Sequence, residues 1–405
     1  MDRQSAPALR RRLSLPLLVM YGTGVAVGAG IYVLVGAVAG HAGRYAPLSF
    51  LLAAVVMGLT VASYSELCTR FPVAAGEAAY VKAAFRSRLL STATGLSMVM
   101  TAIVAAATVA LGASGYIAQF VDWPRPLVAS VILIALGAVS GWGVLESVLL
   151  ASVFTLIEVG GLLVIVGFAF AWGLPVIDSL TAVPPLDAAI WSGIAYASLL
   201  AFFAFIGFED LTNMVEEAKD PARTIPRAIA ITLVITATLY AVTAAVAVTA
   251  LSPAELAGSQ APLSDVFRKL AGASPATISL IAIVATLNTI LAEMTMASRV
   301  VYGMAKLGDL PDIAGKVHPV TSTPLAATGA IVAVTIALVT FVPFERLAEV
   351  TSIATLVVFA MVNLSLLRLR RRRIVTDGPH IRIPLWVPAA GFVTCVGMIA
   401  AALLG

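Results

Sequence analysis

The chain has 405 residues, of which 60% are hydrophobic and 11% are charged. A soluble domain carries about a quarter charged residues, so this composition excludes an ordinary soluble protein and predicts an integral membrane protein. The formal net charge is +4. Because the basic residues cluster beside apolar segments, they favour contact with anionic membrane lipid over contact with nucleic acid.

The apolar residues are gathered in long runs that predict membrane-spanning helices. A helix crosses the ~30 Å hydrocarbon core with about 20 apolar residues, whereas a barrel strand alternates in polarity over only ~10 residues. Runs of helical length predict an all-α protein with about eleven transmembrane helices. In chain order, the predicted segments are 15–39, 47–69, 91–118, 126–142, 148–173, 190–214, 227–250, 275–298, 324–342, 347–367 and 384–404.

The basic residues indicate how these segments are oriented. Lys and Arg are retained on the cytoplasmic side of a membrane. With the N-terminus inside, most of the 25 basic residues fall on that side, among them Arg10–Arg12 and Arg370–Arg373. The sequence predicts a multi-pass protein of the cytoplasmic (plasma) membrane with a basic cytoplasmic N-terminus, residues 1–14. An odd number of spans places the C-terminus outside.

Two of the apolar segments carry residues that interrupt a helix. The first segment contains Gly28 and Gly30, and the sixth contains Gly207 followed by the acidic pair Glu209 and Asp210. Glycines also allow tight packing between membrane helices, which is the alternative explanation for the first segment alone. A second interruption at the matching position favours a different explanation, which is a pair of discontinuous helices.

The two interrupted segments each open a group of five. Transporters built from inverted five-helix repeats place their discontinuous helices at corresponding positions, with the substrate site between them. This pattern predicts a first repeat over residues 15–173, a second over 190–367 and an extra helix over 384–404. The broken ends offer backbone N–H groups to a carboxylate and carbonyl groups to an ammonium, which suits a zwitterion.

Five stretches of the chain resemble motifs of the amino acid permeases in the amino acid, polyamine and organocation (APC) transporter superfamily. The resemblance is most specific in the sixth segment and the loop after it. It implies a LeuT-type fold, with ten core helices in two inverted repeats and further helices after them, and a function that needs no cofactor. The stretches are Val27–Ile31, Ser65–Val81, Phe203–Glu209, Glu216–Ala228 and Ala297–Ala305.

The resemblance also implies a substrate site. Amides of Gly28, Ala29, Gly30 and Ile31 would meet the substrate carboxylate, and carbonyls of Val25, Ala26, Phe203, Ala204 and Ile206 its amino group. Phe205 or Phe208 would close over the substrate as an aromatic gate, with ordinary core or lipid packing as the alternative for each.

Two carboxylates within the spans are candidates for proton coupling, because ionisable residues there are costly and mark functional positions. Glu158 lies midway along the fifth segment, where some related permeases carry a lysine; the alternative is a purely structural hydrogen bond. Glu293 in the eighth segment could share the coupling proton, bind a cationic substrate side chain or bond to a neighbouring helix. Thr295 and Ser298 keep sodium coupling open, as hydroxyl ligands of a sodium ion.

These features together predict a secondary active transporter that imports amino acids by alternating access, coupled to protons. An amino acid exchanger and a transporter of polyamines or cationic amino acids are the alternatives. A membrane enzyme is remote, because His41, His318 and His380 fall in or beside loops and cannot converge into a metal site, and no nucleophile with a neighbouring base is evident. A channel is also remote, because the sequence has no selectivity loops with repeated carbonyl or charged rings. The amino acid transported, the coupling ion and the oligomeric state stay open.

Overall fold

The fold is entirely α-helical across the residues that the computed structural model describes, 13–72, 76–142, 148–213, 215, 218–306, 310–316, 318, 323–373 and 380–404. Their extended structure is limited to one bridge between Leu13 and Ala218. Six helices are long and apolar enough to cross a membrane, and five shorter apolar helices accompany them. The predicted all-α membrane fold is confirmed.

In the first half of the chain, the first predicted segment forms two helices in place of one. They meet at Gly28 and Ala29, inside the glycine-rich stretch. The helices of this half are α1 (Leu15–Val27), α2 (Gly30–Ala42), η1 (Gly43–Tyr45), α3 (Ala46–Arg70), α4 (Gly76–Phe85), α5 (Arg88–Ile117), α6 (Arg125–Trp142) and α7 (Val148–Ala171).

In the second half, the sixth predicted segment also divides, into α9 and the single turn α10. The helices are α8 (Val176–Leu180), α9 (Ala188–Phe203), α10 (Asp210–Asn213), α11 (Pro221–Ala250), α12 (Pro253–Gly258), α13 (Pro262–Ala271), α14 (Ala276–Lys306), η2 (Asp312–Gly315), α15 (Leu325–Phe341), α16 (Phe344–Arg371) and α17 (Trp386–Leu404). Several run past the predicted apolar limits, because charged residues such as those of α16 continue the helix beyond the hydrocarbon core.

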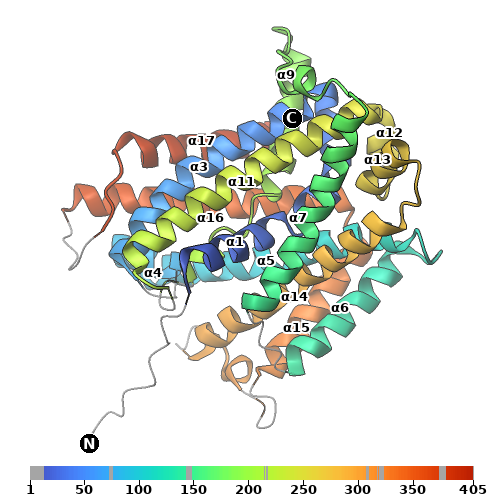
Figure 1. Ribbon diagram of the computed structural model, residues 1–405. Coiled ribbons are helices and arrows are strands. Elements are labelled where there is room, and N and C mark those ends of the chain that lie inside the picture. Colours follow the sequence, from blue (N-terminus) through green and yellow to red (C-terminus); the bar gives the residue numbers. More distant parts are fainter. Residues whose placement is uncertain are drawn as a thin grey trace, which may run out of the picture.

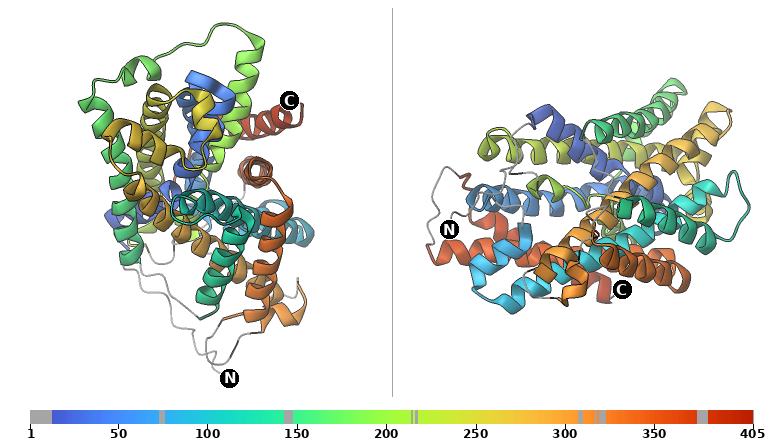
Figure 2. Two further views of the ribbon diagram at one scale, coloured as in Figure 1. Left: turned by 90° about the vertical axis from the view of Figure 1, so that its right-hand side faces the viewer. Right: turned by 90° about the horizontal axis from the view of Figure 1, so that it is seen from below.

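Helices of the first group of five pack against their counterparts in the second. The pairs α3 with α11, α5 with α14 and α6 with α15 are in contact, and the contact of α1 with α7 is matched by that of α9 with α16 (Figure 1, Figure 2). This pairing is consistent with two repeats related by a two-fold axis. The repeat boundaries 15–173 and 190–367 stay predictions.

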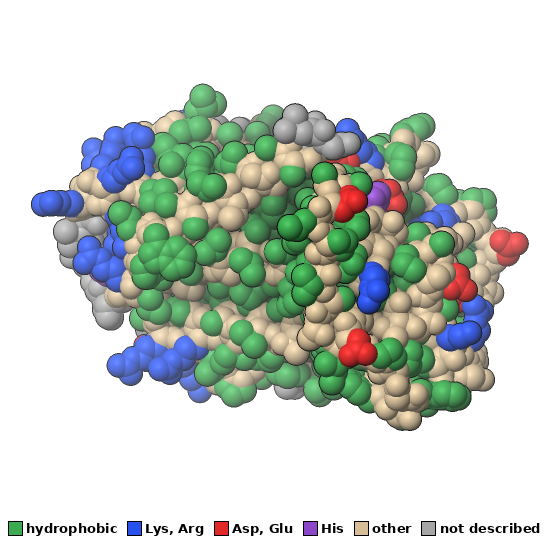
Figure 3. Space-filling view, turned by 90° about the horizontal axis from the view of Figure 1, so that it is seen from above, with side chains coloured by type: hydrophobic (Ala, Val, Ile, Leu, Met, Phe, Trp, Pro, Cys, Tyr) green, Lys and Arg blue, Asp and Glu red, His purple; other side chains and the backbone are tan. Residues whose placement is uncertain are grey.

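The charged side chains mark the two ends of the molecule. Figure 3 shows a large group of Lys and Arg side chains at one end, a broad band of hydrophobic side chains in the middle, and acidic side chains together with several Lys and Arg side chains toward the other end. Hydrophobic side chains are exposed along this band on many helices, among them Val131, Leu156 and Val234. An exposed apolar band between charged ends is the arrangement that a bilayer requires.

A polar network in the membrane region attaches α17 to the bundle. Asn363 on α16 donates from Nδ2 to Thr60 Oγ1 at 3.0 Å, and its Oδ1 accepts from Ser63 on α3 at 2.6 Å. A Cβ at Gly391 of α17 would lie 2.7 Å from that same Oδ1, so only glycine lets α17 approach this closely. Hydrogen-bonded polar groups and small residues are the means by which membrane helices associate.

A buried ion-pair network closes the basic end of the bundle. The carboxylate of Glu66 is fully buried and accepts from Arg370 Nε at 2.9 Å, from Arg70 at 2.9 Å and from the backbone N–H of Ile383 at 2.9 Å. The network joins α3, α16 and the segment leading to α17. A backbone hydrogen bond from Lys219 N to Leu13 O, 2.9 Å long, ties the start of α1 to the start of α11.

Candidate substrate site

The first helix is interrupted where two glycines allow other helices to come close. Gly28 N still donates to Gly24 O at 2.9 Å and ends α1, whereas Val33 N donates to Ala29 O at 3.0 Å and begins the ladder of α2. A Cβ at Gly28 would lie 2.3 Å from Thr289 Oγ1, and one at Gly30 would lie 2.4 Å from Ala204 Cα. Any larger residue would push α14 or α9 away from the interruption.

The backbone at the start of α2 offers groups that can bind an anion. The first residues of an α-helix have N–H groups without partners in the helix, and these carry the positive end of the helix dipole. In α2 they belong to Gly30, Ile31 and Tyr32, because the helical ladder begins with Val33. This geometry suits a carboxylate.

The second interruption, between α9 and α10, is held open by a glycine and a glutamate. Gly207 has φ +115°, a conformation that residues with a side chain rarely adopt. Its N–H donates to Glu209 Oε2 at 2.9 Å, and Thr212 donates to the backbone carbonyl of Glu209 at 2.7 Å. The carboxylate of Glu209 therefore binds the backbone of its own turn.

The two interruptions enclose a small cavity of about 20 Å³. This volume accommodates roughly one water molecule, so an amino acid needs the surrounding helices to move apart. The predicted substrate residues that line it are Val25, Ala26, Ala29, Gly30, Phe203, Ala204 and Ile206. The wall is completed by Ala105 and Val109 of α5 and by Thr289 and Glu293 of α14.

The other predicted substrate residues lie near the cavity without lining it. Gly28 faces Thr289, and Ile31 is fully buried. The ring of Phe205 packs against Tyr240 with centroids 5.0 Å apart, and that of Phe208 packs against Tyr64 at 5.3 Å. Each ring packs in a separate group of aromatic rings in the core, as the packing alternative expects, and the gate stays a prediction.

Tyr240 of α11 connects the two interrupted helices, a role that the sequence did not predict. Its hydroxyl is 2.5 Å from Ala26 O and 2.8 Å from Ala204 O. These are two of the carbonyls predicted to hold the substrate amino group. A hydroxyl has one hydrogen to donate, so the two carbonyls share it and keep the capacity to accept from an ammonium.

Glu158 lies beside this junction, on α7. Its side chain is fully buried, and neither carboxyl oxygen has a hydrogen-bond partner among the described residues. It is close enough to the hydroxyl groups of Tyr32 and Tyr240 to interact with them electrostatically. Tyr32 also donates to the backbone carbonyl of Glu158 at 2.6 Å, and Thr155 donates to Met20 O at 3.1 Å, which holds α7 against α1.

The residues predicted on α14 divide between two faces of that helix. Glu293 faces the cavity, one turn after Thr289. Thr295 instead shares a hydrogen bond with Ser140 of α6 at 3.1 Å, and Ser298 shares one with Thr328 of α15 at 2.9 Å. The structure therefore does not bring Thr295 or Ser298 onto the cavity wall. Within the described ranges, no three His, Cys, Asp or Glu side chains are grouped closely enough to hold a metal ion.

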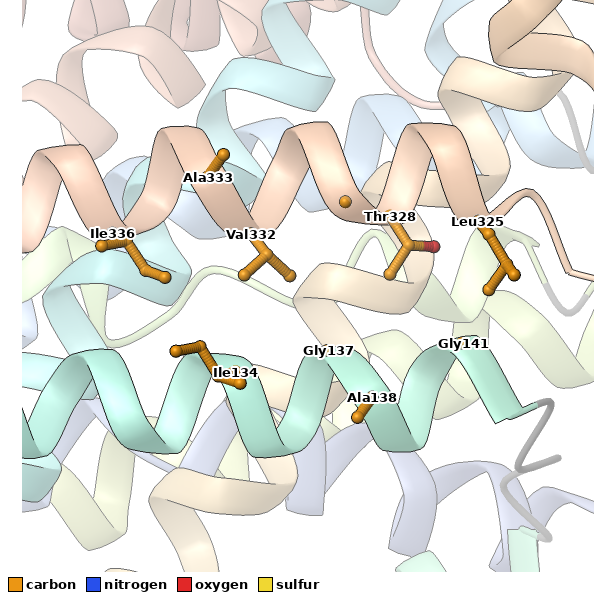
Figure 4. A pocket seen from close by; sticks show the side chains of 10 residues that line it. Ile134, Gly137, Ala138, Gly141, Leu325, Thr328, Val332, Ala333 and Ile336 are labelled. Carbon is orange, nitrogen blue, oxygen red and sulfur yellow. The ribbon is translucent and has the colours of Figure 1, made fainter.

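A larger groove of about 510 Å³ lies between α6 and α15, away from the interruptions. Figure 4 shows α6 and α15 side by side at the groove, with Ile134 on α6 and Val332 on α15 among the residues that line it. Gly137 of α6 lets Val332 come close, because a Cβ there would lie 2.4 Å from Val332 Cγ2. The hydroxyl of Thr328 is already hydrogen-bonded to Ser298 and to Pro324 O. The groove thus offers apolar contacts and no free polar group that would bind a zwitterion.

Comparison with known proteins decides the family. A family model described as an amino acid permease matches residues 13–405. The chain belongs to the amino acid permease family. An uncharacterized transporter of Mycobacterium tuberculosis is 32% identical to this permease over 395 residues, which cover 96% of this chain and 85% of the relative.

Other relatives carry more specific names. A branched-chain amino acid permease of Bacillus subtilis is 27% identical over 388 residues, covering 90% of this permease and 82% of the relative. The vacuolar cationic amino acid transporter 2 of Arabidopsis thaliana is 28% identical over 388 residues, covering 89% of this permease and 60% of the relative. The family confirms that the permease is a multi-pass membrane transporter of amino acids and not an enzyme.

Proposed function

We propose that this permease is a secondary active transporter that imports an amino acid across the plasma membrane by alternating access, in symport with protons. The observation that carries the proposal is the convergence of two interrupted helices on one cavity. The start of α2 presents amides, and the ends of α1 and α9 present carbonyls, to the same enclosed volume. These groups are complementary to the carboxylate and the ammonium of an amino acid.

The arrangement of the helices supports a LeuT-type cycle. The contacts pair α3 with α11, α5 with α14 and α6 with α15, as expected if two inverted repeats, 15–173 and 190–367, rock against each other around a fixed site. The basic end is closed by the Glu66 network and by the Leu13–Ala218 bridge. We place this end, with the N-terminus, in the cytoplasm, because Lys and Arg are retained there.

Glu158 supports coupling to protons. A carboxyl group within the hydrocarbon region is costly and marks proton relays in transporters. Glu158 is buried without a hydrogen-bond partner for its carboxyl oxygens among the described residues. It lies next to Tyr32 of α2, which donates to its backbone carbonyl, and near Tyr240, whose hydroxyl bonds to both interrupted helices. Movement of those helices would change the surroundings of the carboxyl group, and this links uptake or release of its proton to opening of the site.

The test is uptake of a panel of radiolabelled amino acids into proteoliposomes, with and without an imposed inward proton gradient, in sodium-free buffer. The proposal expects at least one amino acid to accumulate only when the gradient is present. Uptake that is independent of protons and sodium but requires amino acid inside the vesicles would identify the protein as an exchanger. Absence of uptake for the whole panel would overturn the proposal.

A further inference from the structure

Among the described residues that line the cavity, Glu293 alone has an ionisable side chain. The other lining residues contribute apolar side chains, backbone groups and the hydroxyl of Thr289. Glu293 comes from α14, which is continuous from Ala276 to Lys306 and therefore keeps its backbone groups engaged in its own helix. At this point α14 can meet a substrate only through its side chains.

The interrupted helices already account for the part of the substrate that all amino acids share. The amides of Gly30 and Ile31 suit the carboxylate, and the carbonyls of Ala26 and Ala204 suit the amino group. The remaining wall, formed by α5 and by Thr289 and Glu293 of α14, faces whatever the amino acid carries beyond its backbone. Glu293 therefore lies where it can contact the side chain of the substrate and distinguish one amino acid from another.

The charged residues around Glu293 indicate which kind of substrate side chain it would bind. Asp210 and Glu209, both acidic, lie close enough to Glu293 to interact with it electrostatically. A carboxylate taken out of water requires a cationic or hydrogen-bond-donating partner. Because its neighbours here repel it, a positive charge brought by the substrate is the partner that relieves the repulsion.

We infer that Glu293 selects amino acids with a positively charged side chain, of the lysine, ornithine and arginine type, by forming an ion pair with that side chain. This inference rests on the proposed function, because it assumes that the cavity holds an amino acid. A polyamine fits less well, since it has no carboxylate for the amides of α2. A neutral amino acid leaves Glu293 without its partner.

The test compares lysine with norleucine, which has the same straight carbon chain without the terminal ammonium. Counterflow into proteoliposomes preloaded with unlabelled amino acid measures both without relying on proton coupling. The wild type should prefer lysine at least about tenfold, since a site built for a polar group rejects the analogue that lacks it. Glu293→Gln should reduce this preference to less than about threefold, while the exposed control Asp178→Asn leaves it unchanged.

The outcomes separate the inference from the proposed function. Norleucine counterflow equal to or better than lysine in the wild type would overturn the inference while amino acid transport stands. If Glu293→Gln is inactive with both compounds, Glu293→Asp, which restores the charge, must recover the lysine preference; failure to recover it would also overturn the inference. Counterflow of no amino acid by the wild type would instead contradict the proposed function.

Discussion

The hydroxyl of Tyr240 lies between two backbone carbonyls, that of Ala26 at 2.5 Å and that of Ala204 at 2.8 Å. Each carbonyl belongs to a different interrupted helix. Interruption frees carbonyls from helical hydrogen bonding, and an unsatisfied carbonyl in the membrane interior is costly. The single hydroxyl therefore stabilises both interruptions and fixes the distance between them.

We predict that Tyr240→Phe weakens the junction. The variant loses the shared hydrogen bond, which should lower the free energy of unfolding by about 1 kcal/mol. The uptake rate should fall at least about fivefold, because small displacements of the groups that bind the substrate slow transport. Thermal unfolding of the purified protein and uptake into proteoliposomes measure the two effects. Tyr45→Phe, at a half-buried position in η1, serves as the control. Unchanged uptake in Tyr240→Phe would contradict the role of the hydroxyl.

Glu77 on the loop helix α4 gives a prediction about pH. Burial raises the pKa of its carboxyl group, opposed by hydrogen bonds that include the one donated by Tyr64 at 2.9 Å. The folded protein thus holds this proton more tightly than the unfolded chain, whose pKa is about 4.3. The resulting stabilisation is present below that pH and is lost as the pH rises through the raised pKa.

Melting temperatures recorded in detergent from pH 4 upward test this prediction. The wild type should lose stability with rising pH more steeply than Glu77→Gln, whose side chain stays neutral and can still accept from Tyr64. Parallel pH profiles for the two proteins would show that Glu77 does not titrate differently on folding.

At the scale of the elements, the close approach of α2 to the interruption after α9 gives a direct prediction. A Cβ at Gly30 would meet the backbone of Ala204 at 2.4 Å, whereas nothing lies within 4 Å of the Cβ position at Gly160 on α7. Gly30→Ala should therefore reduce uptake by at least about a hundredfold, and Gly160→Ala should leave it unchanged. Equal activity of both variants would mean that α2 and α9 are not in contact as described.

The sequence predicted where the helices begin, end and break better than it predicted which face of each helix points to the cavity. Runs of apolar residues determine where helices span, and the glycines around Gly28 and Gly207 indicate where they are interrupted, so both interruptions fall inside predicted stretches. Which face of a helix points to the cavity depends on tertiary packing. For this reason Phe205 and Thr295, chosen from the sequence, lie away from the cavity wall, while Tyr240, which resembles any aromatic residue in an apolar segment, was missed.

At the scale of the whole molecule, the proposed cycle requires the basic end to open. The start of α1 is joined there to the segment before α11 by the bridge between Leu13 and Ala218. Release of substrate on the cytoplasmic side needs the inner parts of the two interrupted helices to separate. The bridge must then break once in each cycle.

A disulfide across this bridge should stop transport. Bridged strands lie about 4.8 Å apart, which is within the Cα–Cα range for a disulfide. The double variant Leu13→Cys with Ala218→Cys should therefore cross-link on oxidation. The buried Cys68 and Cys395 are first replaced by alanine, so that no other cysteine can react. Uptake should fall at least about tenfold on oxidation and recover on reduction. Each single-cysteine variant is the control. Full activity of the cross-linked protein would contradict opening at this end.

Proton movement is the most direct test of the central claim that amino acid uptake is coupled to protons through Glu158. A pH-sensitive dye inside proteoliposomes, without an imposed gradient and in sodium-free buffer, reports proton entry when the transported amino acid is added outside. The wild type should acidify the lumen as the amino acid enters, and Glu158→Gln should abolish this acidification. Acidification of equal size in Glu158→Gln, or amino acid entry into wild-type vesicles without acidification, would contradict the claim.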